Sequence, residues 1–268
     1  MLLGMEKIFR YILITISIVA AFQLFAQDSL KLKIVDEIST FDIDAEGNYF
    51  VADNAFTLFK YSPKGELITN VNIKSYGKIS SIDCSNSFEI YVFHQDQNII
   101  VFYDNMLNLR GELRLNDIYL NNVTCIARSF DNNIWIVDLS QYKLLKINKK
   151  GEILYESQYL NNVLGQDLDT YKIWESNKKV FLADSSNGIY QFDLYATHST
   201  TYYIPNCNEA IGLGKSLFVI QGNRLIEYNM LSRDILTLPY RIKQKSPLSI
   251  FKNKLFFKYK NVFVSIGI

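Results

Sequence analysis

The sequence predicts an all-β fold, namely a six-bladed β-propeller built from four-stranded antiparallel blades. A β-rich hexapeptide recurs six times, and the last residues of successive copies lie 37 to 46 positions apart. A repeat of about 40 residues with several short strands per unit is typical of propellers. The chain is also rich in Tyr and Phe, 18 of each, with only four Pro, and alternation of β-branched and aromatic residues favours strands. The six copies are 48–53, 89–94, 133–138, 179–184, 216–221 and 254–259.

The first repeat shows how we expect one blade to form. It reads as an inner strand at 39–44, a second at 48–52, a third at 57–61 and an outer strand at 66–73. The turn at 62–65 carries Pro and Gly where a tight turn uses each of them. The third repeat follows the same plan at 124–129, 133–137, 143–147 and 152–159.

The sixth repeat is predicted to lack one strand. Its three expected strands are 248–251, 254–258 and 261–266. A spare strand-like run lies near the N-terminus at 30–35. An open ring would leave sheet edges exposed to pairing with other chains. We therefore expect residues 30–35 to supply the outer strand of the sixth blade and to close the ring.

The N-terminus resembles an export signal. Lys7 and Arg10 form a short basic region, residues 11–25 carry no charge, and Ala26 suits the position before a signal-peptidase cut. The alternative is an uncleaved anchor, but this apolar run is shorter than the roughly 20 residues that a membrane span needs. We expect a signal peptide at 1–26, a propeller domain at 27–268 and no stable membrane span after cleavage. The expected location is the periplasm or the outer-membrane surface of a Gram-negative bacterium.

Charge and cysteine content exclude some classes of protein. The net charge of +1 gives no basis for nucleic-acid binding, which depends on neutralising phosphates. Three cysteines, Cys84, Cys125 and Cys207, allow at most one internal disulfide. We expect them to be small buried apolar side chains.

Charge is unevenly distributed between the two ends of the expected ring. Residues 36–59 contain six acidic and no basic residues, whereas residues 241–268 contain seven basic and no acidic residues. One interpretation is a basic patch for an anionic partner. The interpretation that we favour is mutual attraction between the first and sixth blades, which become neighbours when the ring closes.

The run Gly47-Asn48-Tyr49-Phe50-Val51-Ala52-Asp53, followed by Leu58-Phe59-Lys60-Tyr61 and Gly65, resembles the NHL repeat. The third repeat matches through 134–138, 144–147 and Gly151. The segment 77–86 is also similar to a group of exported, uncharacterised propellers of Bacteroidota. This resemblance implies a cell-envelope location and no assigned chemistry.

The candidate reactive residues are few. The two histidines are His94 and His198, and neither has the spacing of a zinc site or a catalytic triad. The residue after each second strand forms an equivalent set: Asp53, His94, Asp138, Asp184 and Gln221. Asp53, Asp138 and Asp184 could bind Ca²⁺, and the alternative function is a metal-dependent hydrolase of lactones or related small molecules. We favour turn capping for this set, and we expect no catalytic residues and no cofactor.

Two long connections between repeats carry apolar residues among Asn and Asp. They are 116–122 and 160–170, and apolar residues on loops often mark partner surfaces. The sequence therefore predicts a non-catalytic cell-envelope propeller that binds an envelope protein through its loop-bearing face. A glycan-binding module is a further alternative, because aromatic residues are abundant. The predicted partner-binding residues are Tyr119, Leu120, Val163 and Leu164.

Overall fold

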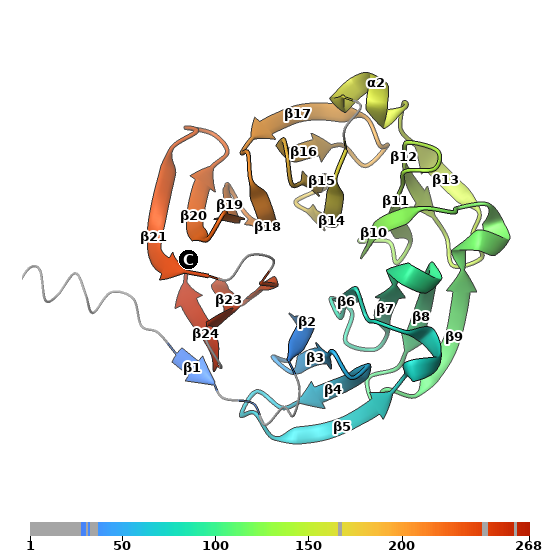
Figure 1. The fold of residues 1–268 in the computed structure, drawn as a ribbon, viewed down its shortest axis with the longest axis vertical. Helices are drawn as coiled ribbons and strands as arrows, with labels where there is room; N and C mark the ends of the chain where they lie inside the picture. The colour runs from blue at the N-terminus through green and yellow to red at the C-terminus, as the bar shows by residue number, and fades with distance from the viewer. Residues whose placement is uncertain (1–27, 31, 33–36, 166–167, 243–245, 260–261) are drawn as a thin grey trace, which may run out of the picture.

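The computed structural model describes residues 28–30, 32, 37–165, 168–242, 246–259 and 262–268. Six four-stranded antiparallel sheets are arranged in a ring around a central axis (Figure 1). The predicted six-bladed β-propeller is therefore confirmed. The predicted signal peptide at 1–26 lies outside the described residues.

In blades 1 to 5, successive strands along the chain lie progressively farther from the axis, as expected from the sequence of the first repeat (Figure 1). The inner strands are β2 (Ile38–Ile43), β6 (Ser81–Asp83), β10 (Val123–Arg128), β14 (Thr170–Ser176), β18 (Cys207–Leu213) and β22 (Leu248–Phe251). The second strands are β3 (Tyr49–Asp53), β7 (Ile90–His94), β11 (Ile134–Asp138), β15 (Lys179–Asp184), β19 (Ser216–Gln221) and β23 (Lys254–Tyr259). The third strands are β4 (Thr57–Tyr61), β8 (Ile99–Tyr103), β12 (Lys143–Ile147), β16 (Gly188–Phe192), β20 (Arg224–Asn229) and β24 (Val262–Gly267). The outer strands of blades 1 to 5 are β5 (Leu67–Asn72), β9 (Leu109–Arg114), β13 (Ile153–Glu156), β17 (His198–Tyr203) and β21 (Ile235–Arg241).

The outer strand of blade 6 comes from the N-terminal side of the chain. β1 (Asp28–Leu30) pairs antiparallel with β24, with Leu30 opposite Phe263. The sequence predicted this strand at 30–35. The paired residues begin earlier, and residues 31 and 33–36 of the predicted range lie outside the described residues. That these residues are required to close the ring stays a prediction.

Short helical turns occupy four of the connections. They are η1 (Lys74–Tyr76), η2 (Gln95–Gln97), η3 (Leu115–Ile118) and α2 (Leu160–Leu164). The two connections predicted as loops thus contain η3 and α2. Among the described residues, no helix has the length and apolar character needed to cross a membrane.

The core lies between neighbouring blades. The second strands are buried on both faces: Phe50 and Ala52 pack towards blade 2, whereas Tyr49 and Val51 pack towards blade 6. An aromatic ring occupies the third position of every repeated hexapeptide and is buried there: Phe50, Tyr91, Trp135, Phe181, Phe218 and Phe256. Burial of one large apolar side chain stabilises the folded state by roughly 1.5–3 kcal/mol. The six buried aromatic side chains therefore explain why the repeated hexapeptide specifies the propeller.

The three cysteines are buried and unpaired, as the sequence predicted. Cys125 and Cys207 belong to the cores between blades 3 and 4 and between blades 4 and 5. Burial raises the pKa of each of these two thiols to about 12. Since the thiolate is the reactive form, neither behaves as a nucleophile near neutral pH.

Candidate functional site

Tyr119, a predicted partner-binding residue, projects from the connection between blades 2 and 3. It directly follows η3, has a left-handed backbone with φ of 62°, and its side chain is 81% exposed. Its N–H donates to the Asn116 carbonyl at 3.1 Å, and its carbonyl accepts from Gln141 Nε2 at 3.0 Å. The backbone is therefore held on two sides while the ring stays in solvent.

Leu120 was predicted as a second partner-binding residue, and the structure shows that this is wrong. Its side chain is 1% exposed and belongs to the core between blades 2 and 3. Its N–H donates to the Leu115 carbonyl at 3.0 Å. The tight turn at η3 places Tyr119 outward and the next side chain inward, which the sequence alone did not indicate.

Val163 and Leu164, the other two predicted residues, lie on α2 between blades 3 and 4. Both are half-buried, and Leu164 packs against the core between these blades. Val163 lines a cavity of about 300 Å³ together with Glu156, Leu160, Phe192 and His198. Val163 is thus placed to contact a partner, whereas Leu164 is mainly a packing residue.

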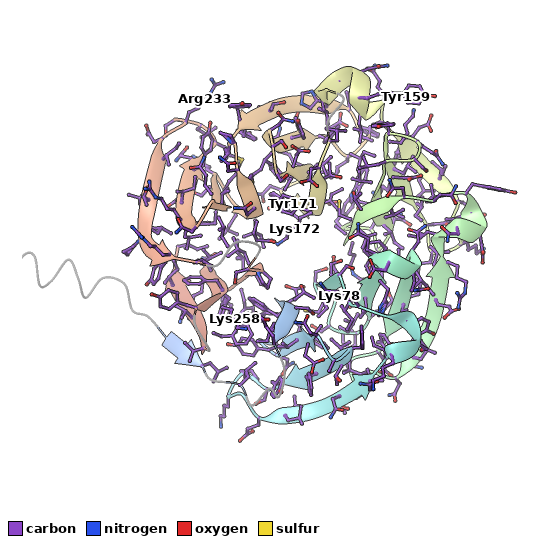
Figure 2. The ribbon with its side chains drawn as sticks, in the orientation of Figure 1. Lys78, Tyr159, Tyr171, Lys172, Arg233 and Lys258 are labelled. Atoms are coloured by element: carbon purple, nitrogen blue, oxygen red, sulfur yellow. The ribbon has the colours of Figure 1, made fainter. Side chains whose placement is uncertain are left out.

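Two tyrosines that the sequence did not single out lie beside these residues. Tyr142, in the turn between β11 and β12, is 36% exposed, and Tyr159, just before α2, is 55% exposed. The Tyr142 carbonyl accepts from Leu160 N–H at 2.7 Å, and Lys143 Nζ lies 4.5 Å from the centre of the Tyr159 ring. Figure 2 shows Tyr159 at the outer rim near α2.

We call Tyr119, Tyr142, Tyr159 and Val163 the tyrosine surface. Two of the hydrogen bonds just described join the connections that flank blade 3 to the turn between its second and third strands: Gln141 Nε2 donates to the Tyr119 carbonyl, and Leu160 N–H donates to the Tyr142 carbonyl. Tyr119 and Tyr142 lie in a predicted connection and a predicted turn, whereas Tyr159 ends the strand predicted at 152–159. The proximity of the three tyrosines depends on the ring geometry.

The repeated aspartates cap turns, as the sequence predicted. Asp53 Oδ1 accepts from the N–H groups of Ala55 and Thr57 at 3.0 and 2.9 Å. Asp138 Oδ1 accepts from Ser140 N–H at 2.9 Å. Asp184 Oδ1 likewise accepts from the N–H groups of Ser186 and Asn187, at 3.0 and 2.9 Å. The described residues contain no group of three or more His, Cys, Asp or Glu suited to a metal ion, so the metal-dependent hydrolase hypothesis gains no support.

His94 and Gln221 were also predicted to cap turns, and this is wrong. His94 Nδ1 lies 3.2 Å from the Gly77 carbonyl, and Gln221 Nε2 donates to the Pro205 carbonyl at 3.0 Å. Both side chains therefore bond to the connection that enters their own blade. The reason is chemical: an aspartate accepts turn N–H groups, whereas these side chains donate to a carbonyl. Burial lowers the pKa of His94.

A second concave site is the central cavity, about 340 Å³ in volume and lined by the inner strands. Tyr171 and Lys172 of β14 lie beside the axis of the ring (Figure 2). Six charged side chains line this cavity: Asp42, Asp83, Arg128, Lys172, Glu175 and Glu209. The sequence did not predict these residues as a group, because they come from five separate inner strands.

Most of these charges are already partnered within the protein. Lys172 Nζ bonds to Glu209 and donates to the Leu248 carbonyl at 3.1 Å. Glu175 Oε2 accepts from Trp135 Nε1 and Ser129 Oγ, both at 2.7 Å. These bonds link blade 4 to blades 3, 5 and 6, so they stabilise the ring.

The Arg128 guanidinium, at the edge of the same cavity, lies over the Tyr91 ring. Its Cζ is 3.6 Å from the ring centre, and Nη1 donates to Asn132 Oδ1 at 3.1 Å. Nη1 also lies 3.4 Å from Glu89 Oε2, and Nε lies 3.8 Å from Asp83 Oδ1. Arg128 thus joins blades 2 and 3.

Asp42 is a carboxyl group of this cavity whose charged form is disfavoured. It accepts from Cys84 N–H at 3.1 Å and from Ser249 Oγ at 2.8 Å, yet burial and the nearby charge of Asp83 raise its pKa. Cys84 Sγ lies 3.3 Å from Asp42 Oδ2. Burial, followed by the Asp42 charge, raises the pKa of the Cys84 thiol. This pair therefore holds a protonated thiol rather than an activated nucleophile.

The chain matches no protein-family model and no curated protein sequence, so the likeness to NHL repeats stays a resemblance. Several solved structures are similar. A streptogramin B lyase has a TM-score of 0.66 at 13% identity, with 91% of this chain and 97% of that chain covered. A protein of Bacteroides fragilis NCTC 9343, provisionally described as exported, has a TM-score of 0.63 at 12% identity, covering 92% and 96%. BamB from Moraxella catarrhalis has a TM-score of 0.53 at 11% identity, covering 87% and 84%.

At these identities the likeness shows the fold alone. The expected resemblance to exported propellers of Bacteroidota is confirmed at that level. The chain shares a β-propeller fold with all three proteins.

Proposed function

We propose that this chain is an exported cell-envelope propeller that binds a protein partner through the tyrosine surface. The observation that carries the proposal is Tyr119, whose exposed ring stands on a backbone fixed by two hydrogen bonds. Tyrosine offers a large contact area at a low cost in conformational entropy. Aromatic residues of this kind dominate the binding energy of many interfaces.

The cavity beside α2 strengthens this proposal. It opens next to Val163 and has Leu160 and Phe192 in its wall, so it offers a partly apolar recess to a partner side chain. Interfaces commonly pair exposed aromatic anchors with such recesses. The partner is thus expected to carry an apolar side chain that enters the recess, and hydrogen-bonding groups for the tyrosine hydroxyls.

An export route is part of the same proposal. Residues 1–26 are proposed to be removed as a signal peptide, leaving 27–268 as the mature domain in the periplasm or at the outer membrane. The likeness to the provisionally exported protein of B. fragilis supports this location. Mass spectrometry of the protein from a periplasmic fraction tests it: the expected N-terminus is Gln27, and an intact N-terminal segment would contradict cleavage.

The binding proposal is tested by affinity capture from envelope extracts with quantitative mass spectrometry. Tyr119→Ala should lose the partner that wild type captures, whereas Tyr119→Phe should retain most of it because the ring remains. Tyr203→Ala is the matched control, since Tyr203 is 70% exposed but lies on the outer strand of blade 4. If Tyr119→Ala captures the same proteins as wild type and Tyr203→Ala, the tyrosine surface is not the binding site.

A further inference from the structure

The junction between blades 6 and 1 contains a cavity of about 400 Å³. Leu30 of β1, the outer strand of blade 6, belongs to its wall, as do residues of blade 1 and of the other strands of blade 6. We call the space the seam cavity. It is distinct from the tyrosine surface, which surrounds blade 3.

Aromatic side chains form most of the wall of the seam cavity. Tyr49 from blade 1 and three phenylalanines from blade 6, Phe251, Phe256 and Phe263, line it, together with Leu30. The centre of the Tyr49 ring lies 6.1 Å from that of Phe256 and 5.7 Å from that of Phe263. These rings stand on paired strands or at their ends, so the wall is preformed and suits an apolar or aromatic group.

Gly47 helps to shape one side of the wall. Its φ is +88°, and a Cβ added there would lie 3.0 Å from the Phe251 ring. A side chain at this position would therefore push Phe251 out of place, in addition to the strain of positive φ. Gly47 lets the turn of blade 1 approach the aromatic ring of Phe251 in blade 6 closely.

The charge at the seam cavity is positive. Lys252 and Lys254 belong to its wall, and none of the described residues in the wall is acidic. Lys252 is exposed in the turn between β22 and β23, with Nζ 4.9 Å from the centre of the Phe251 ring. Among the described residues it has no ion-pair partner. The basic run at 241–268 thus places at least one available cation at an apolar cavity.

We propose that the seam cavity binds a small amphiphilic carboxylate, with its apolar body between the aromatic rings and its carboxylate at Lys252. A volume of about 400 Å³ falls in the range of roughly 300–1,000 Å³ typical of small-molecule sites. Moving the apolar body of the ligand from water to the space between the rings favours binding. The ammonium group of Lys252 distinguishes an anion from a neutral or cationic ligand of the same shape.

The test measures binding of 4-phenylbutyrate and of its neutral amide to the purified protein by isothermal titration calorimetry. The carboxylate should bind, and its affinity should fall as salt is added. The amide should bind about threefold more weakly, because an exposed charge pair contributes a factor of about this size. Lys252→Met should weaken carboxylate binding by about the same factor and leave amide binding unchanged.

Two further variants complete the experiment. Ser265→Met places a longer side chain in the cavity wall and should abolish binding of both compounds, with the melting temperature recorded to show that the variant folds. Lys178→Met, in the corresponding turn of blade 4, is the matched control and should bind like wild type. Absence of carboxylate binding, equal affinities for carboxylate and amide, or unchanged binding by both Lys252→Met and a folded Ser265→Met would each overturn the proposal.

Discussion

Ser249 of β22 donates a hydrogen bond to Asp42 of β2, with Oγ 2.8 Å from Oδ1, although the two residues are 207 positions apart in the chain. The bond joins the inner strand of blade 6 to that of blade 1, at the point where the ring closes. A second donor to Asp42, Cys84 N–H at 3.1 Å, comes from blade 2. One carboxyl group therefore ties three blades together beside the axis.

Removing this donor should weaken the ring. Ser249→Ala leaves the half-buried carboxyl group of Asp42 with one fewer hydrogen bond, and we expect the free energy of unfolding to fall by about 1.5 kcal/mol. Urea denaturation measures the loss. Ser246→Ala is the control, because Ser246 Oγ lies 3.4 Å from the Lys258 carbonyl and its loss should be within about 0.5 kcal/mol. If both variants lose the same free energy of unfolding, the hydrogen bond to Asp42 contributes no more to stability than the contact of Ser246.

Arg128 should not tolerate replacement by lysine. Its guanidinium stacks on Tyr91 and also bonds to Asn132 and Glu89, and an ammonium group cannot reproduce stacking and several directed bonds at once. We expect Arg128→Lys to lower the free energy of unfolding by about 2 kcal/mol. Arg110→Lys, whose side chain is exposed and pairs with Asp104 at 2.7 Å, should change it by about 0.5 kcal/mol or less. Similar changes in the free energy of unfolding for Arg128→Lys and Arg110→Lys would show that the guanidinium of Arg128 has no specific stabilising role.

The architecture could be predicted from the sequence because each blade repeats the same local pattern. The buried third-position aromatic, such as Phe50 or Trp135, is visible in every hexapeptide, and the turn at 62–65 marks the next strand. Strand ends were less predictable. β1 includes Asp28, two residues before the predicted start at residue 30, because Asp28 pairs with Ser265 of β24.

The candidate sites were predicted only in part, for a physical reason. Tyr119 was identified because an apolar residue in a polar loop is visible in the sequence. Leu120 looked equivalent, and only the left-handed turn at Tyr119 separates the exposed from the buried side chain. The tyrosine surface and the seam cavity combine residues from separate repeats, and a single sequence carries no signal for that proximity.

The N-terminal strand should be required for a closed ring. Deleting residues 27–36 removes β1 and exposes β24, and an unpaired strand edge promotes association with other chains. We expect the deletion variant to aggregate and to unfold at a lower temperature, as measured by light scattering and circular dichroism. Leu231→Asp is a control for a change at an exposed residue and should remain monomeric. A soluble deletion variant with unchanged thermal stability would show that this strand does not close the ring.

His94 should make folding stability depend on pH near neutrality. Because the Gly77 carbonyl only accepts, His94 Nδ1 carries the proton in that bond, and Nε2 is buried without a partner among the described residues. Protonation would therefore place an unpaired donor in the core, in line with the lowered pKa that burial causes. In the unfolded chain the histidine has a pKa of about 6.5, so below that value the unfolded state binds more protons than the folded state. Stability is then fully present above about pH 6.5 and is lost as pH falls towards the lowered folded pKa.

Glutamine at this position tests the effect, because its amide can still donate to the Gly77 carbonyl but does not titrate. Urea denaturation of wild type and His94→Gln at several pH values between about 5 and 8 measures it. The free energy of unfolding of wild type should fall relative to that of the variant as the pH is lowered. His198, whose pKa is also lowered by burial, titrates in both proteins and so cancels in the difference. Parallel curves for the two proteins would mean that His94 is not the group responsible.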